Sequence, residues 1–258
     1  MVASAFTSLT LIQINNQAQS ILHKRSRVSP WLLFLQRCPF MNIKPFLLTL
    51  VISSMPVASY AKNWSEEPLT EILQAVAQGD ASAQFALGLM YDEGESVTQD
   101  HKQAARLYQQ AAEQGFTKAL VALGLMYANG EGVTQDHKQA AQLYQQAATQ
   151  GDALAQVALG HMYAKGEGVA ENNEKAVYWW HKAAEQGNTK AQNNLGVMYA
   201  NGDGVEQSYL QAYVWFSIAA VKGHAGAIKG QEATAKKLIR AELKEGLGMA
   251  IRHFEQLS

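Results

Sequence analysis

The sequence predicts an all-α fold, a right-handed superhelical solenoid of helix-turn-helix repeats. Two observations lead to this fold class. A Leu-Gly pair recurs every 36 residues, and each pair is followed by Met-Tyr and then by a Gly-x-Gly-Val or Gly-x-Ser-Val loop. A fixed period of this length is typical of proteins in which each unit buries its apolar face against its neighbours. We therefore predict four complete units, at residues 81–116, 117–152, 153–188 and 189–224.

Residues 41–61 have the order of parts found in a secretory signal peptide. Lys44 supplies the positive start, an apolar run follows over residues 46–52, and Ser59-Tyr60-Ala61 is a small-x-small cleavage sequence. We expect cleavage after Ala61, and hence a periplasmic or secreted mature protein. The apolar run is well short of the roughly 20 residues that span a bilayer, so we expect no stable membrane span in the mature chain.

Residues 1–40 precede this signal and have no evident role in a fold. They are either a non-native extension upstream of the true start at Met41 or a transit peptide, because the stretch is basic, contains serine and lacks acidic residues. The only cysteine of the chain, Cys38, lies here. A mature chain without cysteine excludes a disulfide framework and any site with several cysteine ligands.

Both ends of the repeat array are predicted to be capped. Residues 62–80 should form an N-terminal capping helix, because 68–79 resemble the second helix of a unit. Residues 225–258 should form a degenerate repeat and a capping helix. That last helix is amphipathic, with its apolar face at Leu243, Leu247, Ile251 and Phe254. Terminal repeats with a polar outer side keep a solenoid soluble.

Each complete unit is predicted to contain two antiparallel helices, A and B. In the second unit, Ala119, Leu123, Met126 and Tyr127 have helical spacing and form the apolar stripe of helix A. Glycines in the loop then end the helix, since glycine accepts a positive φ. Helix B follows a good N-cap residue, and in three units a glutamine three residues later completes the pattern of a capping box. The N-cap residues are Asp100, Asp136, Asn172 and Ser208.

A glycine stands in the middle of every helix A. Glycine costs about 1 kcal/mol relative to alanine in a helix interior, so its repetition at one phase predicts a packing reason. We predict a close approach of helices A and B at these glycines. The small residues of helix B expected opposite them are Ala104, Ala140, Ala176 and Ala212.

These motifs resemble the Sel-like repeat (SLR) family, a relative of the tetratricopeptide repeats. The second unit carries the resemblance most clearly, from Ala119-Leu120-Val121-Ala122-Leu123-Gly124 through Gly130-Glu131-Gly132-Val133 to Ala147-Ala148. The resemblance implies a non-enzymatic adaptor in which helix A lines a concave surface that binds a protein or peptide. The cysteine-rich branch of the family has paired cysteines in each unit, and this chain lacks them.

The resemblance also assigns the predicted protein-binding residues, because tetratricopeptide relatives bind ligands through particular positions of helix A. A mostly apolar stripe at these positions suits an extended or helical segment with apolar anchors. The alternative is that several of these side chains pack against the next repeat. Relatives that clamp a peptide often have asparagine directly before Leu-Gly, and only Asn194 matches. The residues assigned are Phe85, Leu89, Val121, Leu125, Val157, His161, Asn193, Asn194 and Val197.

No motif in the mature sequence predicts catalysis. The sequence lacks Ser-x-x-Lys, Gly-x-Ser-x-Gly and His-Glu-x-x-His, and we predict no catalytic, cofactor-binding or metal-binding residue. The balance of 21 Lys and Arg against 22 Asp and Glu excludes the basic footprint of a nucleic-acid binder. His101 and His137 recur in phase, and we expect both to be solvated. An acidic row is interpreted as a solubilising edge or a ridge that steers a basic partner; it comprises Glu95, Glu131, Glu167 and Asp203.

Aromatic residues concentrate on helix B of the third and fourth units. Trp180 and Phe216 align with Tyr108 and Tyr144, so we expect them in the core. We expect Tyr178 and Tyr213 to face outward. The cluster indicates either tighter packing near the C-terminal cap or a contact patch for a protein.

We therefore predict a non-catalytic scaffold or adaptor that binds a protein or peptide and is exported to the bacterial periplasm or secreted. Two alternatives remain open. One is a hydrolase of cell-wall material or β-lactams, the activity associated with cysteine-rich relatives. The other is a secreted factor that acts on host proteins.

Overall fold

The computed structural model describes Trp64 and residues 67–257. The predicted upstream extension and signal peptide, residues 1–61, lie outside this part. All regular elements of the described residues are helical. The helices are α3 (Leu69–Ala77), α4 (Ala81–Glu93), α5 (His101–Glu113), α6 (Thr117–Asn129), α7 (His137–Thr149), α8 (Ala153–Lys165), α9 (Asn173–Glu185), α10 (Thr189–Asn201), α11 (Tyr209–Val221), α12 (Ala225–Ala235) and α13 (Arg240–Leu257).

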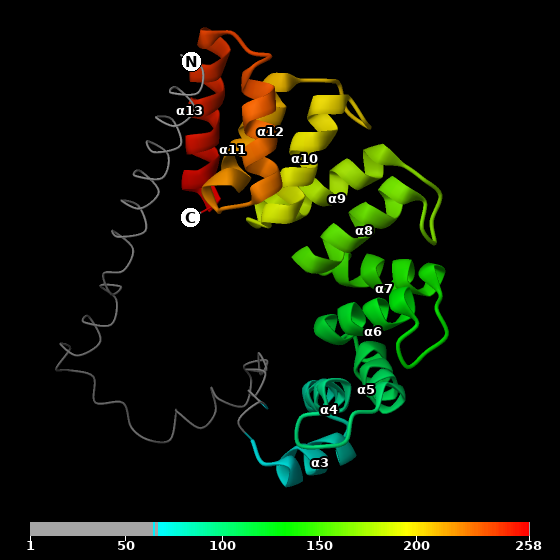
Figure 1. The fold of residues 1–258 in the computed structure, drawn as a ribbon. Coiled ribbons are helices and arrows are strands. Elements are labelled where there is room, and N and C mark those ends of the chain that lie inside the picture. Colours follow the sequence, from blue (N-terminus) through cyan, green and yellow to red (C-terminus); the bar gives the residue numbers. More distant parts are fainter. Residues whose placement is uncertain (1–63, 65–66, 258) are drawn as a thin grey trace, which may run out of the picture.

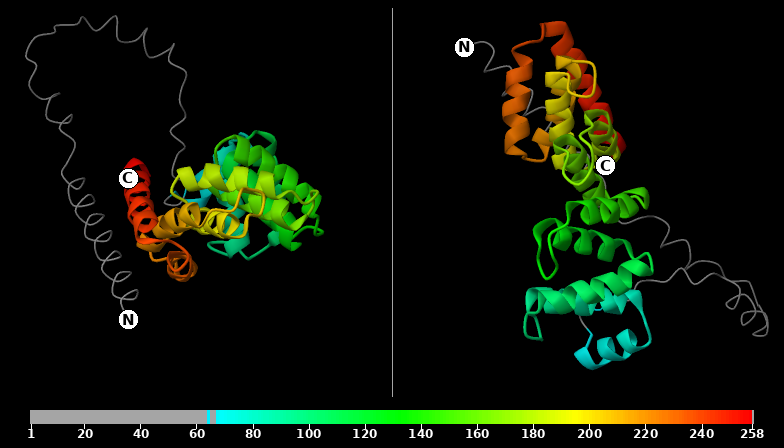
Figure 2. Two further views of the ribbon diagram at one scale, coloured as in Figure 1. Left: turned by 90° about the horizontal axis from the view of Figure 1, so that it is seen from above. Right: turned by 90° about the vertical axis from the view of Figure 1, so that its right-hand side faces the viewer.

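The helices stack one after another along a curved path (Figure 1). Helices A and B of a unit pack together, as α4 does with α5, and helix B also packs on helix A of the next unit, as α5 does on α6. Figure 2 shows the stack from two further sides, with α3 at one end and α12 and α13 at the other. The prediction of an all-α solenoid of helix-turn-helix units is confirmed for the described residues.

The mid-helix glycine of helix A makes room for an aromatic ring of helix B. A Cβ atom on Gly88 would lie 2.6 Å from Cε1 of Tyr108, and one on Gly160 would lie 2.5 Å from Nε1 of Trp180. The predicted close approach is confirmed, but the predicted partner is wrong. The ring two turns along α5 or α9, and not an alanine such as Ala104, occupies the space next to the glycine. The remaining pairs are Gly124 with Tyr144 and Gly196 with Phe216.

The second glycine of each loop joins a unit to the one before it. Gly168 has a φ of +71°, and a Cβ there would lie 2.1 Å from the carbonyl oxygen of His137, the first residue of α7. The first unit has Ser96 at this position, also with a positive φ of 64°. Helix α3 begins at Leu69, about one turn later in the repeat than α5 begins. It is at this end of the array that the loop has serine, at Ser96, in place of glycine.

Helix B begins at the N-cap residues that the sequence predicts. Oδ1 of Asp100 accepts hydrogen bonds from the backbone N–H groups of Lys102 at 2.9 Å and Gln103 at 3.1 Å. The backbone N–H of Asp100, which a capping box would pair with the Gln103 side chain, donates instead to the carbonyl oxygen of Tyr91 at 2.8 Å. The capping-box prediction is therefore wrong in its second half, because the end of helix A supplies the acceptor. The same bond joins Asp136 to Tyr127, Asn172 to Tyr163 and Ser208 to Tyr199.

Helix α11 is buried on every side. All residues from Ala212 to Ala220 are buried, because α11 packs against α10, α12 and α13. Tyr213 is 2% exposed, so the prediction that it faces outward is wrong. Its ring lies where a Cβ on Gly246 of α13 would be only 2.9 Å away. The core positions predicted for Trp180 and Phe216 are confirmed, with 4% of each exposed.

Glutamine pairs tie the start of helix A to the end of helix B. In the first unit, Nε2 of Gln114 donates to Oε1 of Gln84 at 2.8 Å. In the third unit, Nε2 of Gln186 donates both to Oε1 of Gln156 at 2.8 Å and to the carbonyl oxygen of Gly151 at 3.0 Å. The buried amide oxygen of helix A thereby obtains a hydrogen-bond donor.

The fourth unit breaks this pattern. Lys222 stands where the other units have glutamine, and its Nζ donates to the carbonyl oxygen of Gly187 at 2.8 Å. Oε1 of Gln192, whose side chain is fully buried, has no hydrogen-bond partner. A buried acceptor without a partner costs free energy, so this junction is weaker than its counterpart in the third unit.

Candidate functional site

The predicted binding residues lie on helix A of four successive units, in two rows. The first row comprises Phe85, Val121, Val157 and Asn193, and it belongs largely to the packing between helices. The Phe85 ring lies 5.5 Å from that of Tyr108, measured between ring centroids. Val157 is 8% exposed, while Val121 and Asn193 are half-buried. This row therefore offers little side-chain surface to a partner.

The second row, one helical turn further along each helix A, faces solvent more openly. Leu125 is 51% exposed and Val197 is 41% exposed. His161 is also exposed, whereas Leu89 is half-buried. The structure thus places the more accessible predicted residues on α6, α8 and α10. The assignment of these residues to a protein-binding surface stays a prediction.

Leu154 is a further exposed residue that the sequence analysis did not select. It lies on α8 two turns before His161, which places the two side chains on the same face of the helix. Its side chain is 65% exposed. The sequence signal was present, because Ser82, Lys118 and Lys190 fill this position in the other units. We call the set Leu125, Leu154, His161 and Val197 the exposed stripe.

His161 and Asn194 connect two neighbouring units within this region. Nε2 of His161 lies 3.2 Å from Nδ2 of Asn194, and the His161 ring meets that of Trp180 edge-on at 5.2 Å between centroids. Partial burial lowers the pKa of His161, and the nearby Lys165 and Lys190 act in the same direction, although Glu167 opposes them. His161 therefore favours its neutral form, and its imidazole presents a polar but uncharged group between Leu125 and Val197.

The charges near the exposed stripe are unevenly placed. Helices α6, α8 and α10 contain Lys118, Lys165 and Lys190 and no aspartate or glutamate. The acidic row lies in the loops that follow these helices, and its members make local contacts. Asn129 donates to Glu131 at 3.1 Å, and Lys165 lies 3.7 Å from Glu167. These contacts are consistent with the solubilising edge that the sequence analysis proposed.

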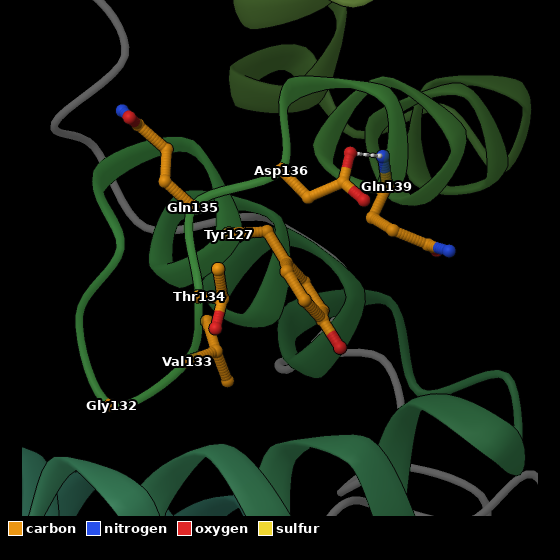
Figure 3. A pocket seen from close by; sticks show the side chains of 7 residues that line it. All are labelled: Tyr127, Gly132, Val133, Thr134, Gln135, Asp136 and Gln139. Carbon is orange, nitrogen blue, oxygen red and sulfur yellow. Dashed lines mark hydrogen bonds between the residues drawn. The ribbon is translucent and has the colours of Figure 1, made fainter.

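A shallow hollow of about 550 Å³ lies beside the loop of the second unit (Figure 3). Tyr127 and the loop from Gly132 onward line it together with Asp136 and Gln139. The Asp136 carboxylate is already engaged as the N-cap of α7, as the dashed line in Figure 3 shows. None of the predicted binding residues lines this hollow, and the side chains of Gln135 and Asp136 already hydrogen-bond to the local backbone.

His101 has a partner that the sequence analysis missed. Its Nδ1 lies 2.7 Å from Oδ1 of Asp92, and the hydroxyl of Tyr108 lies 3.4 Å from Oδ2 of the same carboxylate. The expected surface position of His101 agrees with the 41% exposure of its side chain, but the imidazole is also paired with Asp92. His137, in the next unit, has Ala128 at the position equivalent to Asp92. Within the part of the chain that the structure describes, no group of three or more His, Cys, Asp or Glu side chains is arranged to hold a metal ion.

Comparison with known proteins identifies the repeat. The family model of the Sel1 repeat matches residues 81–116, 117–152, 153–188 and 189–224, which together are more than half of the chain. The chain therefore belongs to the Sel1 repeat family, and the resemblance stated from the sequence is confirmed. No curated protein matches it.

The similar solved structures include the following two. One is c5321, a protective antigen present in uropathogenic Escherichia coli strains that displays an SLR fold. It is 42% identical with a TM-score of 0.62, over 63% of this chain and 35% of that one. The other is a Sel1 repeat protein from Oxalobacter formigenes, 34% identical with a TM-score of 0.59, over 62% of this chain and 65% of that one. This chain thus spans about a third of the first relative and just under two thirds of the second.

Membership of the family has a general functional meaning. Sel1 repeat proteins are generally protein-interaction scaffolds, and the fold is generally non-catalytic. In the described helices, no segment is both long enough and apolar enough to cross a membrane.

Proposed function

We propose that this protein is a non-catalytic scaffold that binds a protein or peptide along the exposed stripe, in the bacterial periplasm or after secretion. One observation supports the site above all others. Of the six large apolar side chains that are exposed in the described residues, three belong to the stripe: Leu125, Leu154 and Val197. Apolar side chains gathered on one exposed surface often mark an interaction site.

The charges narrow the chemistry of the partner. Helices α6, α8 and α10 contain Lys118, Lys165 and Lys190 and no carboxylate, although Lys165 lies 3.7 Å from Glu167 in the following loop. Residues 62–258 as a whole carry a net charge of −6. A segment that has apolar anchors flanked by acidic side chains matches this surface. Ion pairs between these exposed lysines and acidic side chains of the partner mainly favour the correct orientation and a faster encounter. The apolar anchors contribute most of the affinity.

The test is a triple substitution on the stripe. Leu125→Asp, Leu154→Asp and Val197→Asp together should abolish capture of a specific partner from a periplasmic extract or the culture medium. The exposed positions should tolerate the change, so circular dichroism should report the parent's helicity. The matched control is Leu73→Asp with Ile239→Asp, two exposed apolar residues, 46% and 67% exposed, that lie toward the ends of the described chain. A folded stripe variant that keeps every partner, or a control that loses the same partners, would show that the stripe is not the binding site.

The export part of the proposal has a separate test. It rests on the signal-like sequence of residues 41–61, and the periplasm and the medium are both consistent with it. Cells that express the chain from Met41 should yield a processed protein outside the cytoplasm, and its N-terminal sequence should begin at Lys62. A protein that is recovered unprocessed from the cytoplasm would contradict export.

A secreted factor that acts on host proteins is the second candidate. It is supported by the similarity to a protein described as a protective antigen present in uropathogenic Escherichia coli strains. Fractionation of the culture distinguishes the two sites of action, because this candidate requires mature protein in the medium rather than in the periplasm alone.

A further inference from the structure

The two ends of the described stack are halves of a repeat unit. Helix α3 corresponds to a helix B, and no helix A packs on it from before it within the described residues. Helix α12 corresponds to a helix A, but α13, which follows it, packs mainly on α11. Glu232 of α12 stands where the complete units have their mid-helix glycine, and it is exposed, whereas those glycines are buried. The outer side of each end is therefore open to an incoming helix.

Each end also exposes one large apolar side chain. Leu73, on α3, is 46% exposed, and Ile239, in the connection between α12 and α13, is 67% exposed. Figures 1 and 2 show α3 and this connection at opposite ends of the stack, so the two residues cannot meet within one copy. Neither residue belongs to the exposed stripe. The terminal units of a solenoid ordinarily present a polar outer side, so an apolar side chain at both ends indicates a contact.

The two ends carry net charges of opposite sign. Residues 67–100, which include α3 and α4, contain seven acidic side chains and no lysine or arginine. Residues 222–257, which include α12 and α13, contain seven lysines and arginines and four acidic side chains. Lys229 is exposed on α12, and Lys236 and Lys237 are exposed just before Ile239. The end with Leu73 is thus acidic, and the end with Ile239 is basic.

We propose that copies of this chain associate head to tail, with α3 of one copy docked against α12 and the α12–α13 connection of the next. The opposite charges attract these two surfaces, while pairing of like ends brings charges of the same sign together. Leu73 and Ile239 supply the apolar part of the contact. The contact brings a helix B to a helix A, the partner that each end lacks. Because the two surfaces differ, association leaves one surface of each kind open and continues into a chain of copies.

Sedimentation velocity tests the association on the protein purified in the form that the cell accumulates. The sedimentation coefficient should rise with protein concentration at about 0.05 M salt. The rise should be several-fold smaller at about 0.5 M salt, because salt screens the attraction between exposed charges. The matched control is Tyr178→Lys, which changes an exposed aromatic residue on α9, between the two ends, and should associate as the parent does.

Substitutions at the two ends identify the contact. Leu73→Lys adds a positive charge to the acidic end, and Ile239→Asp adds a negative charge to the basic end. Each variant alone should stay monomeric, but their equimolar mixture should form a dimer and nothing larger, because one intact end of each kind remains. Lys236→Glu with Lys237→Glu is a second variant of the basic end and should behave as Ile239→Asp does. Circular dichroism should report the parent's helicity, since all of these side chains are exposed.

Three results would overturn the proposal. The parent could stay monomeric at every concentration in low salt. Either single variant could associate alone as strongly as the parent, which would mean that like ends or another surface make the contact. The mixture could stay monomeric although the parent associates. The test of the exposed stripe is separate from this one, because its control, Leu73→Asp with Ile239→Asp, should lose self-association and still capture the proteins that bind the stripe.

Discussion

Single residues at equivalent positions differ in role because their neighbours differ. His101 pairs with Asp92, while His137 meets no such carboxylate because Ala128 replaces it. The same reasoning applies where helix B ends. Gln186 serves two acceptors at once, whereas Lys222 serves one and leaves the Gln192 amide oxygen without a donor.

Lys222→Gln should therefore stabilise the protein. A glutamine there can copy Gln186, donating to the Gly187 carbonyl oxygen and to Oε1 of Gln192, which gives a gain of about 1 kcal/mol in the free energy of unfolding. Partial burial also lowers the pKa of Lys222, although the residue as a whole is exposed. Urea denaturation measures the effect, with the exposed Lys229→Gln as control. A lower midpoint for Lys222→Gln would contradict the proposed pairing.

At the scale of elements, two kinds of glycine contact set the spacing of the helices. The mid-helix glycines receive rings from helix B of the same unit, so they fix the distance within a unit. The second loop glycines press against the start of helix B in the preceding unit, so they fix the distance between units. The second, third and fourth units therefore each carry a spacer in both directions, and the regular stack follows from local contacts.

Gly168→Ala should cost much more than Gly151→Ala. Both glycines have a positive φ, which costs an alanine about 1–2 kcal/mol. A Cβ on Gly151 would meet nothing within 4 Å, but one on Gly168 would meet the His137 carbonyl oxygen at 2.1 Å. We expect overpacking to add about 1–3 kcal/mol in the second case. Equal urea midpoints for the two variants would show that the loop does not press on the preceding helix.

At the scale of the whole molecule, stability is distributed along the stack. Each helix packs mainly on those before and after it, so the free energy is close to a sum over units and their junctions. The N-terminal end is closed by α3 and by Trp64, which packs with Ile72, Ala83 and Leu87. The C-terminal end is closed differently, since α13 turns back onto α11.

Leu87→Ala and Leu159→Ala should therefore destabilise different numbers of neighbouring units. Both leucines are at most 4% exposed, and emptying either site should cost about 2–5 kcal/mol. Leu87 lies in the first unit, so its loss should raise hydrogen exchange in α3 and α4 while α8 stays protected. Leu159 lies inside the array, so its loss should raise exchange in the units on both sides. The same exchange pattern in both variants would mean that the array unfolds as one unit.

The period of 36 residues located helices A and B because every unit repeats its glycines and caps. It could not identify which ring lies on Gly88, since Tyr108 is about one turn further along α5 than Ala104, the residue that the spacing suggested. It also could not place Tyr213, because the helix that covers it, α13, lies outside the period. Leu154 is not among the predicted binding residues, because the positions that bind ligands in tetratricopeptide relatives do not include it and its exposure is visible only in the structure. For α11, an apolar sequence on all sides was the available signal of complete burial.

The burial of α11 has a consequence for biosynthesis. During translation, α11 leaves the ribosome while α12 and α13, its remaining cover, are still unmade; some 36 further residues separate the end of α11 from the end of α13. At ~5–20 residues per second, the apolar α11 of the nascent chain is exposed to solvent for a few seconds before the helices that cover it are made. A premature stop codon before Arg240 would remove α13 and leave the surface of α11 that it covers permanently exposed. Such a product should aggregate or be degraded.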